Sequence, residues 1–259
     1  MGQPWADQPY TLLPLPGMPG QRTSTNKDVL DMAVEMAHVH NLILRGMNAI
    51  YHQCEHVTKP GDIKDFVLYI KTWGDMVHHH HSMEETEAFP GWDGIAKAAG
   101  ASESITSRNV EQHHAFEQGF EELRTYVGEM HEGKAEYDAA KVKDMIERFA
   151  PILNVHLHDE VNMILDMEKY DGKALKKVMD AAAQTSVNSA DPNLVLPMLF
   201  GCYDKTVPGL GKFPPVPFFL PYLNALWFSR KHQSIWRFNP CDHWGRPRPL
   251  AFAGPSQTQ

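Results

Sequence analysis

The chain carries the same four-residue unit twice, as His80-x-x-x-Glu84 and His156-x-x-x-Glu160, each within a segment of helical periodicity. A spacing of four places both side chains on one face of an α-helix, one turn apart. An imidazole nitrogen and a carboxylate oxygen can converge there on one point. Two further segments each place a histidine, His40 or His113, on an otherwise apolar stripe. Four helices that each turn a histidine inward, two with a glutamate beside it, predict a buried site for two metal ions.

Four long segments show the apolar spacing of amphipathic helices. They run from Thr25 or Asn26 to about His56, Ile63 to Ala88, near Ser102 or Ser104 to Gly133, and near Asp138 to Ile164. Pro90-Gly91 is expected to stop the second segment. Long amphipathic helices with short connections predict an all-α fold built on an antiparallel four-helix bundle.

The rest of the chain divides by composition. We expect an extended, proline-rich arm over residues 1–24, the bundle over 25–170, and a short helix with a linker over 171–190. Residues 191–259 hold 11 of the 19 prolines and many aromatic residues. So apolar a segment will not stay solvated, and we expect a largely irregular C-terminal extension packed on the bundle.

Composition narrows the partners and the compartment. A formal charge of −8 without a basic stripe argues against nucleic acid. Three cysteines form no C-x-x-C pair, which favours a reducing compartment. The N-terminal segment lacks the features of a signal peptide, and no stretch is apolar enough for a membrane span. A cytoplasmic protein without a membrane partner is expected.

A single histidine on an apolar helix face is usually a core residue with one hydrogen-bond partner. Here the pattern recurs in four helices, which unrelated structural histidines would seldom produce. Glutamate is also rarely buried without a partner, so Glu84 and Glu160 in core register require a cation. The recurrence therefore favours the metal site over four independent core histidines.

Register selects among neighbouring candidates. Residues 78–81 lie 100° apart around a helix axis, and His80 continues the apolar stripe best, with Glu84 one turn on. His81 with Glu85 is the same unit rotated by one residue and is the alternative pair. Glu117, four residues after His113, is an additional candidate ligand.

The types of donor atom indicate which metal the site would bind. About four imidazoles and two or three carboxylates, without thiolate, suit iron or manganese better than structural zinc. Iron is favoured over manganese. Coordination positions not filled by the protein would be open to a small ligand.

The chain resembles the hemerythrin-like (HHE cation-binding) domains over about residues 28–168. Four stretches carry the resemblance: His40 to Asn48, Glu84-Glu85-x-x-x-Phe89-Pro90, Gln112-His113-x-x-Phe116 and His156-x-x-x-Glu160. The resemblance implies a four-helix bundle with two iron ions, Fe²⁺ or Fe³⁺, joined by an oxo or hydroxo bridge. It implies as ligands His40, His80, Glu84, His113, His156 and Glu160, with both glutamates bridging.

The chain departs from the oxygen-carrying hemerythrins at two positions. Those proteins use a second histidine one turn after the ligand of helix three, where this chain has Glu117. They also place an aspartate five residues after the last histidine, whereas Glu160 follows His156 by four. Both departures argue against a carrier role alone.

Three functions remain. The first is an O₂-dependent oxidoreductase, an oxidase or oxygenase, in which a small organic substrate lies near the iron and the C-terminal extension shapes its pocket. The second is reversible binding of O₂ or NO as a carrier, scavenger or sensor. The third is iron storage or sensing without catalysis. We favour the first. The C-terminal extension can equally serve only to cap the bundle.

Overall fold

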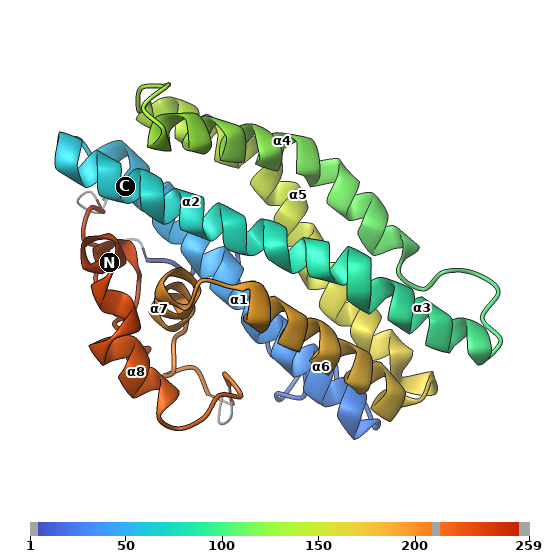
Figure 1. Cartoon of the computed structure of the whole chain (residues 1–259). Coiled ribbons are helices and arrows are strands. Elements are labelled where there is room, and N and C mark those ends of the chain that lie inside the picture. Colours follow the sequence, from blue (N-terminus) through green and yellow to red (C-terminus); the bar gives the residue numbers. More distant parts are fainter. Residues whose placement is uncertain (1–4, 209–212, 254–259) are drawn as a thin grey trace.

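The computed structural model describes residues 5–208 and 213–253, and every regular element in those ranges is a helix. The all-α prediction is confirmed. Four long helices dominate: α1 (Lys27–Gln53), α2 (Pro60–Met83), α4 (Ser107–His131) and α5 (Ala139–Asp166). In Figure 1 they lie side by side, and each contacts two others, α1 with α2, α2 with α4, α4 with α5 and α5 with α1.

Side-chain caps set where several helices begin. Of the two predicted starts for α1, the structure uses Asn26, whose side chain accepts a hydrogen bond from the backbone N–H of Val29. Asp138 caps α5 and Asp171 caps α6 (Gly172–Ser189) in the same way. Each cap satisfies a backbone donor that the first helical turn leaves unpaired.

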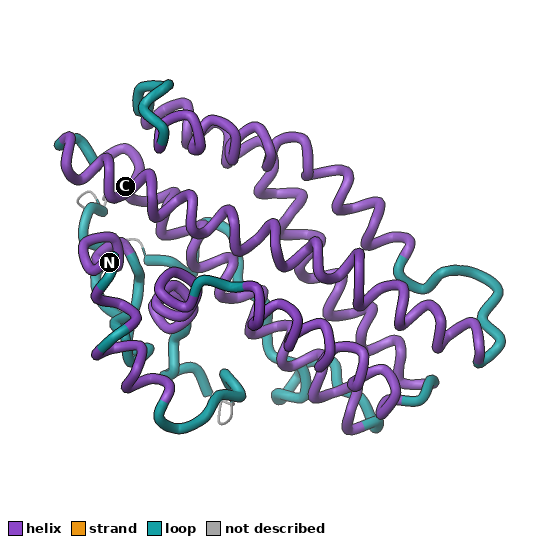
Figure 2. The backbone as a smooth tube through the Cα atoms, viewed as in Figure 1, coloured by secondary structure: helices purple, strands orange, loops and turns teal. Residues whose placement is uncertain are grey.

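The helix that carries His80 does not stop at Pro90-Gly91, so that prediction is wrong. A π-helical turn, η2 (Glu84–Ala88), joins α2 directly to α3 (Phe89–Ala98), and Figure 2 shows one continuous run of helix. The N–H of Phe89 bonds to the carbonyl of Glu84. Pro90 falls in the first turn of α3, where a proline without an N–H is tolerated. Single π-turns occur often at functional sites, and this one begins at Glu84.

A close approach of α1 and α2 fixes the helices around the site. A Cβ added to Gly46 would lie 2.5 Å from Cδ1 of Trp73, so only glycine leaves room for this indole. The Trp73 side chain is fully buried, and its Nε1–H donates to the carbonyl of Ile43 at 3.0 Å. The contact lies one to two turns from His40 on α1 and from His80 on α2.

The N-terminal arm runs along α1 and is bound to it by two buried amides. Asn41 pairs with both the N–H and the carbonyl of Leu13, at 2.7 and 3.0 Å. Asn48 donates to the carbonyls of Ala6 and Tyr10 and accepts from the N–H of Tyr10. These side chains supply hydrogen-bond partners that the extended backbone of the arm would otherwise lack.

The C-terminal part packs against α1 and α2. It contains α7 (Pro192–Cys202) and α8 (Leu220–Leu226), followed by the short 3₁₀ helices η4 (Phe228–Arg230) and η5 (Gln233–Phe238), joined by irregular segments. Contacts link α7 to α1 and α2, and η5 to α2. Figure 1 places α7 and α8 on the side of the molecule away from α4.

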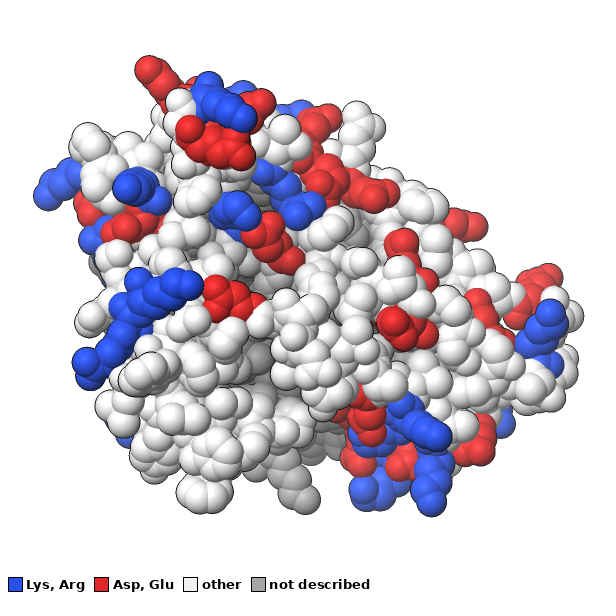
Figure 3. Space-filling model, viewed as in Figure 1, with Lys and Arg blue, Asp and Glu red and all other residues white. Residues whose placement is uncertain are grey.

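Acidic and basic side chains are interspersed on the face shown in Figure 3. The large uncharged area at lower left covers the region of α8, whose neighbourhood exposes Phe218, Tyr222, Leu226 and Trp227. Among the described helices, none combines the length and the apolar character needed to cross a membrane.

Candidate metal centre

Four helices bring seven ionisable side chains together in the interior. They are His40 from α1, His80, His81 and Glu84 from the α2–η2 junction, His113 from α4, and His156 and Glu160 from α5. The side chains of His40, His156 and Glu160 are fully buried, and that of His80 is 16% exposed. The six residues expected from the sequence therefore converge, and a seventh joins them.

The donor atoms form two groups. His40, His80 and Glu84 make the first, and their donor atoms lie within 4.8 Å of one another. The second group consists of His81, Glu84, His113 and His156, and their donor atoms also lie within 4.8 Å of one another. The donor atoms of either group are close enough together to surround one ion.

Glu84 belongs to both groups, and its two oxygens point in different directions. Oε1 lies 2.9 Å from Nε2 of His80, while Oε2 lies 3.7 Å from Nε2 of His113. Glu160 occupies the corresponding position on the other side. Its Oε2 is 3.4 Å from Nε2 of His40 and 3.6 Å from Nε2 of His156. Each carboxylate thus contacts one histidine of either group, which is the placement that a bridging ligand needs.

The sequence predicts His80 or, as the alternative, His81 as a metal ligand, whereas in the structure both face the cluster. The His80 ring lies 5.4 Å from the His40 ring, between centroids, and the His81 ring lies 4.6 Å from that of His113. The centre of the cluster lies between the directions in which the two side chains leave the helix. Because consecutive residues are 100° apart around the axis, the His80 ring reaches one group and the His81 ring reaches the other. The expectation that only one of them faces inward is wrong.

Glu85 and Glu117 do not join the groups. Glu85 is partly exposed and accepts a hydrogen bond from Nδ1 of His113 at 2.6 Å. Glu117 is exposed on α4. Phe116 takes the buried position beside it, with its ring 5.0 Å from that of His81 and 5.5 Å from that of His156. The candidate ligand position predicted at Glu117 is therefore not brought to the cluster.

Hydrogen bonds at the far nitrogens orient three of the rings. Nδ1 of His40 donates to the carbonyl of Leu157 at 2.7 Å, and Nδ1 of His113 donates to Glu85. Nδ1 of His156 lies 3.4 Å from Oε1 of Gln112. Since these acceptors hold the hydrogen on Nδ1, each Nε2 presents a lone pair to the cluster, as in histidine ligands of metals. The spacing of residues in the sequence does not predict this role for Glu85 or Gln112.

Most of the inward atoms have no hydrogen-bond partner in the part of the chain that the structure describes. Both oxygens of Glu84, both oxygens of Glu160 and Nε2 of His40, His80 and His81 are buried and unpartnered among the described residues. Burial lowers the pKa of His80, His81 and His156, so these rings are neutral at physiological pH. Burial raises the pKa of Glu84, and the nearby Glu160 carboxylate adds to this effect.

Unsatisfied carboxylates and neutral imidazoles in a core are costly unless a cation compensates them. The donor set contains five imidazoles and two carboxylates. The three cysteines, Cys54, Cys202 and Cys241, are absent from both groups. The residues present therefore fit a metal ion at each group, with nitrogen and oxygen ligands.

Comparison with known proteins supports this interpretation. A family model described as the hemerythrin HHE cation binding domain matches residues 31–181. A protein from Cryptosporiopsis sp. (strain 8999), named dimeric xanthone biosynthesis cluster protein R11, is 38% identical over 257 residues. That alignment covers 98% of this chain and 95% of the relative. No solved structure gives a significant match.

Proposed function

Because this chain belongs to the hemerythrin HHE cation-binding family, we propose that its antiparallel four-helix bundle holds two iron ions and acts as an O₂-dependent oxidoreductase on a small organic substrate. His40, His80 and Glu84 would hold one ion. His81, Glu84, His113 and His156 would hold the other, and Glu160 would contact both.

One observation carries this proposal: both carboxylates lie between the two groups with all four oxygens unpartnered among the described residues. Two divalent cations need negative ligands to be tolerated in a core, and two shared carboxylates meet that need. Mixed imidazole and carboxylate donors favour iron. Manganese is the alternative metal.

The chain's own residues orient the donors and exclude water. Glu85, Gln112 and the Leu157 carbonyl hold three imidazoles in the tautomer that leaves Nε2 free. Phe89 and Phe116 cover the His113 ring, with centroids 5.6 and 5.7 Å away. Iron bound there would supply the binding and reduction of O₂, chemistry that amino-acid side chains lack.

The name of the 38% identical relative assigns that protein to a biosynthesis cluster for a dimeric xanthone. A relative aligned over nearly its whole length supports a biosynthetic role here as well. It favours catalysis over iron storage or sensing.

A second candidate is reversible binding of O₂ or NO. His81 favours it, because this residue adds a fifth imidazole to the cluster while Glu117 faces solvent. That donor set is closer to the histidine-rich set of an oxygen carrier than the sequence predicted.

Metal analysis tests the proposal first. Protein loaded anaerobically with Fe²⁺ should hold two iron ions per chain, and Glu160→Ala should lower this number, whereas exposed Glu117→Ala should not. Protein that binds only zinc would refute the proposal. The reduced protein should then consume O₂ faster when a small organic substrate is added. A coloured adduct reversed by removing O₂ would instead favour the carrier.

A further inference from the structure

We propose that a cavity between the first turns of α4 and the last turns of α5 binds the substrate, a compact planar aromatic compound bearing phenol and carbonyl oxygens. Its identification as the substrate site rests on the proposed function, whereas its ability to bind such a compound does not. The cavity has a volume of about 330 Å³, at the lower end of the ~300–1,000 Å³ common for small-molecule sites.

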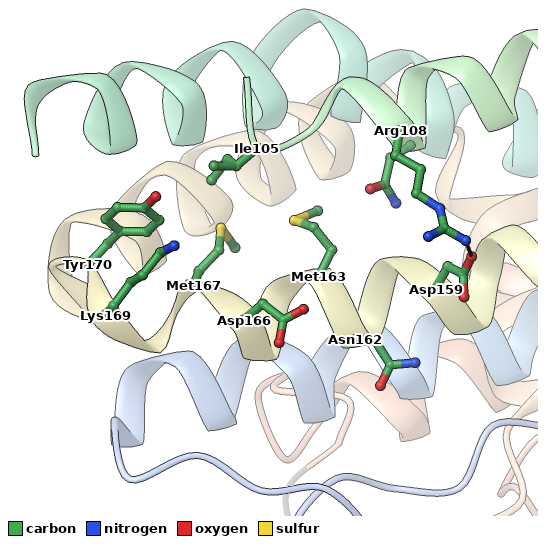
Figure 4. Close-up of a pocket in the computed structure, with 10 residues that line it drawn as sticks. Ile105, Arg108, Asp159, Asn162, Met163, Asp166, Met167, Lys169 and Tyr170 are labelled. Atoms are coloured by element: carbon green, nitrogen blue, oxygen red, sulfur yellow. Dashed lines mark hydrogen bonds and ion pairs between the residues drawn. The ribbon is translucent and has the colours of Figure 1, made fainter. Parts of the chain in front are cut away.

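Part of the cavity wall is apolar. Ile105 lies on one side, and Met163 and Met167 project toward it from α5 and η3 (Met167–Lys169) in Figure 4. The ring of Tyr170 closes one end. Thioethers adapt to the shape of a flat ring and make favourable sulfur–aromatic contacts. These walls therefore favour a planar aromatic ligand.

One buried donor in the lining has no partner within residues 5–208 and 213–253. Asn109 is 2% exposed, and its Nδ2 makes no hydrogen bond among the described residues. An unpaired amide N–H₂ in a core is costly. A ligand with a carbonyl or phenol oxygen would remove this cost, so Asn109 selects for an acceptor on the buried end of the ligand.

The exposed rim adds one available cation. Arg108 pairs with Asp159 at 2.7 Å, and Asp166 is paired with Arg22. The ammonium of Lys169 enters no ion pair among the described residues and lies 5.1 Å from the Tyr170 ring centroid. It is placed to attract an oxygen that carries partial or full negative charge. The outer end of the ligand would therefore also bear an oxygen, as in a phenol or carboxylate.

The cavity adjoins the metal centre along both helices. Asn109 precedes His113 by four residues, and Met163 follows Glu160 by three, so each pair shares a helix face at a rise of roughly 4.5–6 Å. The lining residue Asp159 also accepts from Gln112 at 2.8 Å, and Gln112 contacts His156. A compound bound in the cavity would thus lie beside the proposed metal-binding residues. It would also contact the chain of hydrogen bonds that orients His156.

Calorimetric titration with 6-acetyl-2-naphthol, a planar phenolic ketone whose two oxygens lie at opposite ends of the molecule, tests the site on the full chain with and without iron. Asn109→Leu keeps the branched shape and the number of heavy atoms of the side chain but removes the donor, and it should weaken binding about tenfold. Met163→Trp should fill the cavity and abolish binding. Lys169→Ala should weaken binding several-fold. Asn188→Leu and Lys177→Ala, at exposed positions on α6, are the matched controls.

Wild-type protein that binds no probe would overturn the proposal. So would unchanged affinity in Asn109→Leu with circular dichroism equal to wild type, which remains decisive if Met163→Trp fails to fold. Iron binding and O₂ reaction without probe binding would refute this site alone. Probe binding to a chain that holds no iron would refute the proposed function alone.

Discussion

His113 and His156 point their Nε2 atoms at each other across 3.0 Å, while each Nδ1 faces an acceptor on the opposite side of its ring. With the hydrogens held on Nδ1, two lone pairs meet, a contact that is repulsive by itself. Burial lowers the pKa of His156, so protonation of this ring, which would relieve the repulsion, is unfavourable. A cation bound by both nitrogens removes the repulsion, and the oriented pair thereby favours metal over a purely structural role.

Replacing His81 tests the residue that distinguishes the structure from the sequence-based ligand set. His81→Ala should lower iron from two ions toward one per chain, because the second group loses an imidazole while His40, His80 and Glu84 remain. The measurement is iron per folded chain. His78→Ala is the matched control, since His78 is 53% exposed and its Nδ1 lies 3.3 Å from Oε1 of Glu121. Equal iron in both variants would contradict the assignment.

Glu85 is predicted to act through His113 rather than on the metal. Glu85→Ala removes the acceptor at 2.6 Å and should weaken Fe²⁺ binding by about 10- to 100-fold, as the loss of such partners does elsewhere. Glu85→Gln retains an acceptor oxygen and should recover part of the affinity. Competition with a chromophoric chelator measures both. The neighbouring exposed Glu87 provides the control variant, Glu87→Ala, and an equal loss there would argue against a specific role.

Metal binding should release a proton from Glu84. Burial raises the pKa of Glu84 well above the ordinary value of 4.5. Without metal, this carboxyl group therefore keeps its proton up to a higher pH than an exposed glutamate does. A cation requires the ionised form, and affinity should therefore rise with pH. Calorimetry of Fe²⁺ binding in two buffers of different ionisation enthalpy counts the protons released. Uptake without proton release would show that Glu84 is already ionised in the metal-free protein.

Much of the arrangement was predictable from local pattern. Helical periodicity placed His40, His113 and His156 on buried stripes, and capping residues marked the start of α1 and α5. Such signals depend on residues three or four apart, which the helix itself brings together. The convergence of four separate helices followed because each stripe must face the same core.

The remaining features depend on contacts that periodicity does not describe. His81 joins the cluster because the centre lies between two side-chain directions, and Glu117 loses its position to Phe116. The π-turn that carries the helix through Pro90 depends on a hydrogen bond from Phe89 to Glu84. The cavity beside Asn109 arises where the end of α5 meets the loop before α4.

Arg45 is a buried charge whose loss should destabilise the fold away from the metal. Its side chain is 5% exposed, and its Nε lies 2.9 Å from Oδ1 of Asp7, while Nη2 lies 3.9 Å from buried Asp204. Arg45→Met would leave Asp204 without its cation and should cost about 2–4 kcal/mol of unfolding free energy. Urea denaturation of the metal-free protein measures this cost. The exposed Arg148→Met should change stability by less than about 0.5 kcal/mol.

His38 should make stability depend on pH independently of the metal ligands. Its ring is buried beside Phe213, with centroids 4.7 Å apart, and burial with the charge of Arg45 lowers its pKa to about 4. In the unfolded chain the pKa is close to 6.5. Between these values the unfolded state binds the extra proton, so folding stability must fall as pH decreases from 6.5 to 4.

His38→Phe keeps an aromatic ring against Phe213 but removes the titrating group. It should therefore flatten the decline of stability over this pH range by about 1–2 kcal/mol, after allowance for partial solvent screening. Urea midpoints of the metal-free protein at pH 7, 6, 5 and 4.5 measure the effect as a difference from wild type, because the cluster histidines titrate in both proteins. His78→Phe at the exposed position should retain the wild-type slope. An unchanged slope in His38→Phe would show that His38 keeps an ordinary pKa in the folded protein.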